Sequence, residues 1–429
     1  MKKSHLLLGL IVILMLAATS ITVFAQDPVE LRITWYNDSN EGEVLRDLLD
    51  RFEAENPDIR VVVDTIPYDA ILNQLPVDVQ AGEGPDMARV TDQAAYRGFY
   101  LDLRPLVADA AYWDESFPAA ALAALREEGD ESGLYGFPNQ FTVSAPYINR
   151  TLFEQAGIEV PSDSMDAVSW EEWTEAAASV AQATGTPYAI TMDRSGHRFA
   201  GPMFSQGATL FNEDGTLTID SEGFRSMAQI LVDWHTRGLT PVEVWVGSGG
   251  TYSAGADFFI NGQVVMYMSG SWQVGRFAND IGDAFDWAVV PNPTGPGGST
   301  GMPGGTFMVA FGDTEHPAEV ARVMDYLASA DVLREFSERS LFIPAHLGLG
   351  ELNFATENAL AEAALVTFAS EVPKLTDQAY QLQYGGQGFA INNPIRDRLT
   401  QVIAGELSLD DAVARIQQDI DDALATAGQ

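Results

Sequence analysis

The sequence predicts an α/β fold with a parallel β-sheet. In the first part of the chain, segments with a strand pattern alternate with segments of helical periodicity, and this order is typical of a parallel sheet with right-handed crossovers. The chain has 429 residues and is 46% hydrophobic, so it can build about two or three lobes with real cores. In open sheets of this kind, ligands bind beyond the carboxyl ends of the strands.

The first elements are recognised by their hydrophobic periodicity. Apolar residues alternate in the expected strands and recur on one face of the expected helices. Asn56-Pro57 ends the first helix, and Pro76 favours a bend in the second. The expected elements are a strand over 29–36, a helix over 43–55, a strand over 59–66, a helix over 69–80 and a strand over 87–90.

The pattern changes after the short aromatic segment LYGFPNQFT, residues 134–142. Ser169 and Glu172 have the spacing of a capping box, which predicts a helix over 169–184. Asp214-Gly215 predicts a hairpin turn. The later expected elements are a helix over 221–235, a helix ending at Gly262 and leading into a strand over 264–268, strands over 285–291 and 306–311, an irregular Pro/Gly-rich segment over 291–305, and helices around 317–329, 355–371 and 407–425.

The N-terminal segment has the pattern of a secretory signal. Lys2 and Lys3 precede an apolar run, and Val23-Phe24-Ala25 supplies a cleavage site, so residues 1–25 are expected to be removed on export; an uncleaved membrane anchor is the alternative. The chain contains no cysteine, which excludes disulfides, a cysteine nucleophile and a lipid-modified cysteine. The expected location is periplasmic, or at the extracellular face of the cytoplasmic membrane, without lipidation.

Charge and motifs bear on the class of function. The net charge of −38 disfavours nucleic acid and anionic membranes as partners. Residues 297–301 (GGSTG) match the nucleophile motif of serine hydrolases, but they lie in an irregular segment with no helix following. The sequence has no P-loop and no zinc-protease motif, so we expect no cofactor, no metal and no catalytic residue. Paired carboxylates of an exported carbohydrate-active enzyme remain an alternative, since the chain has 61 acidic residues.

Several longer motifs occur in a fixed order along the chain. Together they resemble the family 1 extracellular solute-binding proteins, the maltose-binding-protein-like receptors of ABC importers, over residues 29–425. The motifs are AGEGPDMARV (81–90), YGFP (135–138), APYINRTLFEQAGIEVP (145–161) followed by SWEEW (169–173), FFINGQVVMYMSGSW (258–272), PGGTFMVAF (303–311) and IPAHLG (343–348).

The resemblance implies a two-lobe periplasmic-binding-protein-like fold of type II, with a ligand cleft between lobes joined by crossing strands near 137–144 and 289–293. It implies a monomeric receptor that captures a sugar or oligosaccharide and delivers it to the permease of an ABC transporter by hinge closure. The same receptor binding an anion such as glycerol 3-phosphate is an alternative. The expected boundaries are a signal peptide over 1–25, the first lobe over 26–139 and 291–345, and the second lobe over 140–290 and 346–429.

Candidate ligand-binding residues follow from the chemistry of sugars. Aromatic side chains cover the apolar faces of a sugar, and amides or carboxylates pair with its hydroxyls. Since adjacent strand residues face opposite sides, one of Trp35 and Tyr36 is expected in the core. The candidates are Trp35, Tyr36, Asn37 and Asp38 after the first strand, Asp92 and Gln93 after the third, Asn139 and Gln140 in the crossing, Trp272 after the strand over 264–268, and Gly304, Gly305 and Tyr384.

For several of these candidates a structural role is the alternative. The polar residues at strand ends are also typical of turns and helix caps, and Trp272 could instead pack under a loop. The resemblance favours Trp272, because family members commonly place an aromatic residue of the second lobe in the cleft at this position. Arg194, His197 and Arg198 form a basic cluster that would suit an anionic ligand or, more simply, pair with surface carboxylates.

Overall fold

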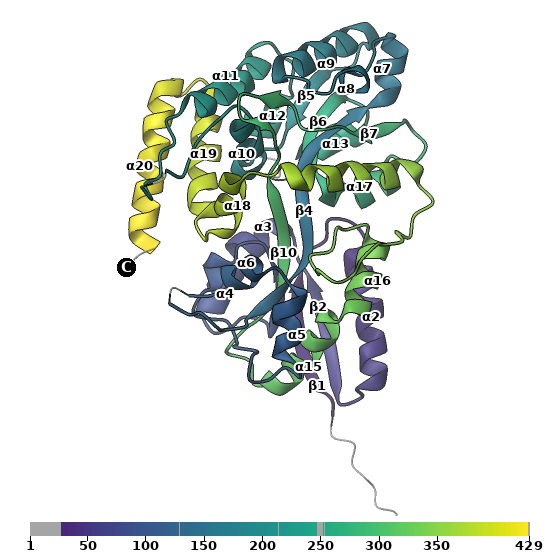
Figure 1. Ribbon diagram of the computed structural model, residues 1–429, viewed down its shortest axis with the longest axis vertical. Helices are drawn as coiled ribbons and strands as arrows, with labels where there is room; N and C mark the ends of the chain where they lie inside the picture. Colours follow the sequence, from purple (N-terminus) through teal and green to yellow (C-terminus); the bar gives the residue numbers. More distant parts are fainter. Residues whose placement is uncertain (1–26, 128, 213, 247–251, 253, 428–429) are drawn as a thin grey trace, which may run out of the picture.

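The computed structural model describes residues 27–427 except 128, 213, 247–251 and 253 (Figure 1). The expected signal segment over 1–25 lies outside the described residues. Two α/β lobes lie one above the other in Figure 1, joined by long strands. Within the described part of the chain, every helix is too short or too polar to cross a membrane.

One continuous sheet runs through both lobes in the order β2-β1-β3-β10-β4-β6-β5, with β7 paired to β4. In the first lobe, β1 pairs in parallel with both β2 and β3, which confirms the predicted parallel sheet. The strands are β1 (Val29–Trp35), β2 (Ile59–Thr65), β3 (Met87–Val90), β4 (Gly136–Asn149), β5 (Tyr188–Met192), β6 (Val264–Gly270), β7 (Trp287–Val289) and β10 (Pro303–Ala310); β8 (Thr294–Gly295) and β9 (Gly298–Ser299) form a separate hairpin.

Helices of the first lobe cover the sheet with apolar faces. Val44, Leu45, Leu48, Leu49 and Phe52 of the first of them are buried, as the periodicity predicted. The helix expected over 69–80 is split in two around Gln74, because Pro76 lacks an N–H and occupies the first turn of the second piece. The helices are α2 (Glu41–Glu55), α3 (Tyr68–Asn73), α4 (Leu75–Gln80), α5 (Ala110–Ser116), α6 (Ala119–Ala124), α15 (Pro317–Ala328) and α16 (Ala330–Ser340).

The second lobe is more helical. The capping box of Ser169 and Glu172 is present at the start of α9, as predicted. The helices are α7 (Arg150–Ala156), α8 (Pro161–Ser164), α9 (Trp170–Thr184), α10 (Gly196–Ser205), α11 (Glu222–Thr236), α12 (Val242–Val246), α13 (Ala254–Ile260), α14 (Val274–Asp280), α17 (Ala359–Glu371), α18 (Asp377–Tyr384), α19 (Gly388–Ile403) and α20 (Leu409–Ala427).

Strand β4 crosses between the lobes, since its first part pairs with β10 and its second part with β6 and β7. The return crossing runs along β10 and not near 289–293. The β8–β9 hairpin keeps the chain on the second lobe, where Gly297 N donates to Ser205 O of α10 at 2.8 Å. The Pro/Gly-rich segment is therefore a hairpin of the second lobe that precedes the crossing.

Candidate functional site

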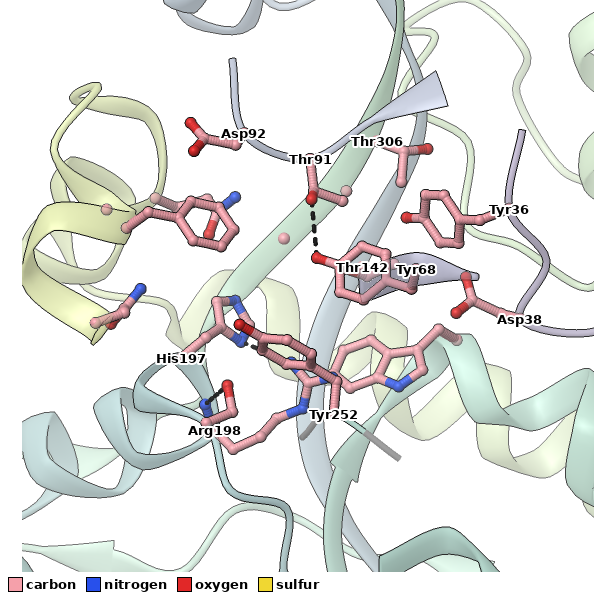
Figure 2. Close-up of a pocket in the computed structure, with 18 of the residues that line it drawn as sticks. Tyr36, Asp38, Tyr68, Thr91, Asp92, Thr142, His197, Arg198, Tyr252 and Thr306 are labelled. Atoms are coloured by element: carbon pink, nitrogen blue, oxygen red, sulfur yellow. Dashed lines mark hydrogen bonds between the residues drawn. The ribbon is translucent and has the colours of Figure 1, made fainter. Parts of the chain in front are cut away.

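A cleft of about 360 Å³ lies between the two lobes. It is bounded by the carboxyl ends of β1 and β3, by the crossing strands β4 and β10, and by the starts of α10 and α19. Figure 2 shows Tyr36 and Asp38 of the first lobe across from His197 and Arg198 of the second. The cleft brings together these predicted residues: Tyr36, Asn37, Asp38, Asp92, Gln93, Gln140, Trp272, Gly304 and Gly305.

Trp35 does not line the cleft. Its side chain is 1% exposed and packs edge-on against Phe336 in the first-lobe core. Its indole Nε1 donates to Asn37 Oδ1 at 2.9 Å, so the tryptophan supports a cleft residue from behind. Tyr36, the next residue, faces the other side and lines the cleft, as the alternation of strand side chains requires.

Asn139 and Tyr384 also lie behind the cleft and do not line it. Asn139 is buried and accepts a hydrogen bond from Thr306 Oγ1 at 2.7 Å, which ties β4 to β10. Tyr384, the last residue of α18, donates its hydroxyl to Gly304 O at 3.1 Å. The side chains of Asn139 and Tyr384 therefore help to hold β4 and β10 in place, and other residues of these two strands line the cleft.

Other cleft residues escaped the sequence prediction. Tyr68 begins α3 directly after β2 and bonds Thr91 Oγ1 at 2.8 Å, so the strand-end argument that gave Tyr36 could also have found it. Phe389 and Asn392 belong to α19. This helix was not predicted, because Gly388 and Pro394 are residues that disfavour a helix. The remaining additions are Thr91, Ala94, Thr142, Ser195, Gly196, Tyr252, Gln273, Arg276, Thr306, Gln383, Gly386, Gly388 and Asn393.

Arg89 lies in the middle of β3 and is fully buried behind the cleft. Its Nη1 donates to Tyr36 O at 2.6 Å and to Glu41 Oε1 at 2.8 Å. Its Nη2 donates to Asp38 Oδ2 and to Gln140 Oε1, both at 3.0 Å. The guanidinium carbon also lies 4.1 Å from the centroid of the Tyr36 ring. One buried cation therefore holds three cleft residues in place.

The carboxylate of Asp38 is the main acceptor on the first lobe. Burial raises its pKa from 3.8 to about 6, and the charge of Arg89 opposes this shift. Glu41 adds a second negative charge nearby and accepts the backbone N–H groups of Asp38 and Ser39. Arg89 bonds Oδ2, and the described residues give the other oxygen of Asp38 no hydrogen-bond donor.

Asp92 combines a structural role with its place in the cleft. Its Oδ1 accepts from Ala94 N at 3.1 Å and from Ala95 N at 3.3 Å, which forms a side-chain turn at the start of the 3-10 helix η1 (Ala94–Tyr96). Burial raises the pKa of Asp92. The turn that the sequence offered as the alternative role is present, and the residue also lines the cleft.

Trp272 lies in the turn η2 (Ser271–Gln273), directly after β6, and lines the cleft with 8% of its surface exposed. A side chain at Gly270 would come within 2.1 Å of its ring, which explains the glycine before it. The guanidinium of Arg198 stacks on the ring of Trp272, with its carbon 4.1 Å from the ring centroid. Of the basic cluster, His197 and Arg198 line the cleft, while Arg194 does not.

His197 is held in its neutral form. Its Nε2 donates to Pro303 O at 3.0 Å, which leaves Nδ1 unprotonated to accept from Arg198 Nη1 at 3.2 Å. Burial and the adjacent charge of Arg198 lower its pKa from 6.5 to about 3.

We expect nitrogen NMR of the His197 imidazole to show the Nε2–H tautomer and no titration between about pH 5 and 8. Since the unfolded histidine takes up a proton below pH 6.5 and the folded one does not, this group lowers stability as the pH falls from 6.5 towards 3. The variant His197→Gln identifies the signal. A titration near pH 6.5 would contradict the bonding pattern described here.

Comparison with known proteins identifies the family. Residues 36–333 match the bacterial extracellular solute-binding proteins. A Brucella abortus (strain 2308) protein named as a binding protein is 25% identical over 400 residues, which cover 87% of this chain and 93% of the relative. The arabinooligosaccharide-binding protein of Halalkalibacterium halodurans is 26% identical over 321 residues, covering 72% of this chain and 68% of the relative.

The fold has solved counterparts. The GacH receptor of Streptomyces glaucescens GLA.O, whose structures include a complex with acarbose, has a TM-score of 0.73 at 22% identity and covers 93% of this chain and 98% of its own. The likeness confirms the predicted two-lobe fold. Because the family match extends over most of the chain, the protein belongs to the bacterial extracellular solute-binding proteins.

Proposed function

We propose that the protein is the receptor of an ABC importer and captures a sugar or oligosaccharide between its lobes. The observation that carries the proposal is the make-up of the cleft, which combines aromatic rings with amides and carboxylates. Tyr36, Tyr68 and Trp272 offer ring surfaces or edges, while Asp38 and Gln140 offer hydrogen-bonding groups. A sugar needs both kinds of contact.

The relatives support this ligand class. They include an arabinooligosaccharide-binding protein, a galactooligosaccharide-binding protein of Bacillus subtilis and a lactose-binding protein of Rhizobium radiobacter. The family is extracellular, so the chain acts outside the cytoplasm. A cleaved signal over residues 1–25 and a monomer without a lipid anchor complete the proposal.

Transport would follow from closure of the two lobes. The cleft is lined by Asp38 of the first lobe and by Arg198 of the second, so a bound sugar would bridge the two lobes. A ligand that binds both lobes favours the closed form over the open form. The permease would recognise this closed form and receive the sugar.

The two alternatives have less support. An enzyme that cleaves sugars needs two carboxylates on opposite sides of the bond, whereas the carboxylates that line the cleft, Asp38 and Asp92, both belong to the first lobe. The relatives are also named as binding proteins. An anionic ligand such as glycerol 3-phosphate would lie against these same two carboxylates.

We expect neutral di- and oligosaccharides to raise the melting temperature, because ligand that binds only the folded state stabilises it by mass action. The probes are arabinobiose, galactobiose, lactose, maltose and maltotriose, each followed by tryptophan fluorescence and isothermal titration calorimetry. Glycerol 3-phosphate serves as the anionic control. If a saccharide is recovered in altered form after incubation, the protein is an enzyme and not a receptor. If none of the saccharides raises the melting temperature, the proposal of a sugar ligand is wrong.

A further inference from the structure

In the second lobe, the indole of Trp272 is covered by the guanidinium of Arg198. The Arg198 guanidinium lies over this ring, with 4.1 Å from its carbon to the ring centroid, and the chain at Gly270 packs against the benzene side of the same ring. Stacking of a guanidinium on tryptophan is a stable arrangement that leaves its N–H groups free to donate in the guanidinium plane.

His197 orients this guanidinium from a second direction. Its Nδ1 accepts from Arg198 Nη1, and its own Nε2 is fixed by Pro303 O of the returning strand. The ring and the imidazole together restrict the long arginine side chain to one position. A donor held in this way loses little conformational freedom when a ligand binds.

Among the described residues no carboxylate lies within salt-bridge distance of Arg198, although its charge acts from farther away on Asp193 and Asp38. Its Nε is buried and has no hydrogen-bond acceptor within the described chain. The residue also lies in the first turn of α10, where the helix dipole disfavours a cation. Each of these features lowers stability. A ligand that accepts hydrogen bonds from the terminal N–H groups of the guanidinium would offset the missing salt bridge and the unfavourable helix dipole, whereas the buried Nε stays out of its reach.

We infer that Arg198 determines ligand specificity, by donating two parallel N–H groups to adjacent hydroxyl oxygens of a neutral saccharide whose other face donates to Asp38. The inference rests on the proposed function and adds the second-lobe contact and the geometry of the ligand. The planar fork of arginine matches a pair of neighbouring acceptors. Figure 2 shows Arg198 and Asp38 on opposite sides of the cleft.

The cleft also indicates why the paired acceptors are hydroxyls and not a carboxylate. Asp38 and Asp92 line the same space as Arg198. Arg276 also lines the cleft, but it already pairs with Asp257 and Asp280. An acidic sugar would therefore gain one cation that has no salt bridge in the described chain, Arg198, and would meet two carboxylates, whereas a neutral sugar can donate its hydroxyl protons to them. The guanidinium of Arg198 then donates hydrogen bonds to hydroxyl oxygens of the ligand and does not serve as its counter-ion.

The test compares Arg198→Met and Arg198→Lys with the wild type by isothermal titration calorimetry, using the saccharide of the panel that binds most tightly. We expect Arg198→Met to weaken binding about tenfold or more, since charge-assisted hydrogen bonds are lost. Arg198→Lys keeps the charge but lacks the fork, so it should recover only a small part of the affinity. The matched control Arg150→Met removes a surface arginine of the second lobe that pairs with Asp163, and it should bind like the wild type.

Ligand-free melting temperatures separate binding from folding, because Arg198→Met loses the unfavourable features of Arg198 and should melt at or above the wild-type temperature. Wild-type affinity in Arg198→Met would overturn the inference while leaving the proposed function in place. Full affinity in Arg198→Lys would show that charge suffices and would overturn the paired donation. Tighter binding of galacturonic acid than of any neutral saccharide would replace the hydroxyl pair with a carboxylate. If no saccharide binds the wild type, the proposed function fails and this inference fails with it.

Discussion

Replacing Arg89 with methionine is expected to lower the free energy of unfolding by about 3–5 kcal/mol, the range for removing one partner of a buried ion pair. The substitution leaves Glu41, which is 0% exposed, and Asp38 without their shared cation. It also leaves the carbonyl of Tyr36 and the amide of Gln140 without their donor. Urea unfolding followed by circular dichroism and tryptophan fluorescence measures the loss.

A matched arginine on the neighbouring strand provides the control. Arg32 of β1 pairs with Asp64 at 2.7 Å, but its side chain is 58% exposed, so Arg32→Met should change stability by less than about 1 kcal/mol. The double variant Arg89→Met with Glu41→Gln should recover part of the lost unfolding free energy, because it removes one of the two carboxylates that Arg89→Met leaves without a cation. If Arg89→Met costs no more than Arg32→Met, the buried network contributes little to the fold.

The expected loss matters for function because the network joins the cleft to the crossing strands. Gln140 lies on β4, and Thr306 on β10 lies 3.4 Å from Nε of Arg89. Both strands run between the lobes. The cleft-lining side chains Asp38 and Gln140 and the two crossing strands therefore share one buried cation. Arg89 therefore positions residues that line the cleft, although it does not line the cleft itself.

Much of the fold could be predicted from the sequence, because its signals are local. Alternation identified β1 and β2, helical periodicity identified α2 and α11, and the Ser169–Glu172 spacing identified the start of α9. Elements whose residues break local rules were missed. Helix α19 contains Pro394 and begins at Gly388, and it forms because Ile391, Ile395 and Leu399 are buried against the second-lobe core.

Part of the site could be predicted from strand ends, and the family resemblance added Gln140, Gly304 and Gly305 of the crossing strands. Tyr36, Asp38 and Gln93 were found because residues after parallel strands meet at one edge of the sheet. Arg89 gave no such signal, since its partner Glu41 lies 48 residues away and both are buried by tertiary packing. The pairing of Arg198 with Trp272 likewise joins α10 to η2 across the chain.

Asp38→Asn should weaken saccharide binding about tenfold or more, because a carboxylate accepts a hydroxyl proton more strongly than an amide oxygen does. Wild-type affinity should rise as the pH increases from 5 to 7, since Asp38 ionises with a pKa of about 6 and the ionised form is the better acceptor. The variant should show no such rise. Calorimetry at a series of pH values measures both effects, and an unchanged affinity or pH profile in Asp38→Asn would place the ligand elsewhere.

The same substitution should not destabilise the ligand-free protein at pH 7, and this sets Asp38 apart from Arg89. The folded pKa of Asp38 lies above its ordinary 3.8, so the folded state binds more protons between pH 3.8 and about 6, and stability falls as the pH rises through that window. Asparagine removes this penalty and the repulsion from Glu41, and Arg89 keeps one buried partner. Equal or higher stability together with weaker binding would show that the fold tolerates an unfavourable carboxylate because the ligand needs it.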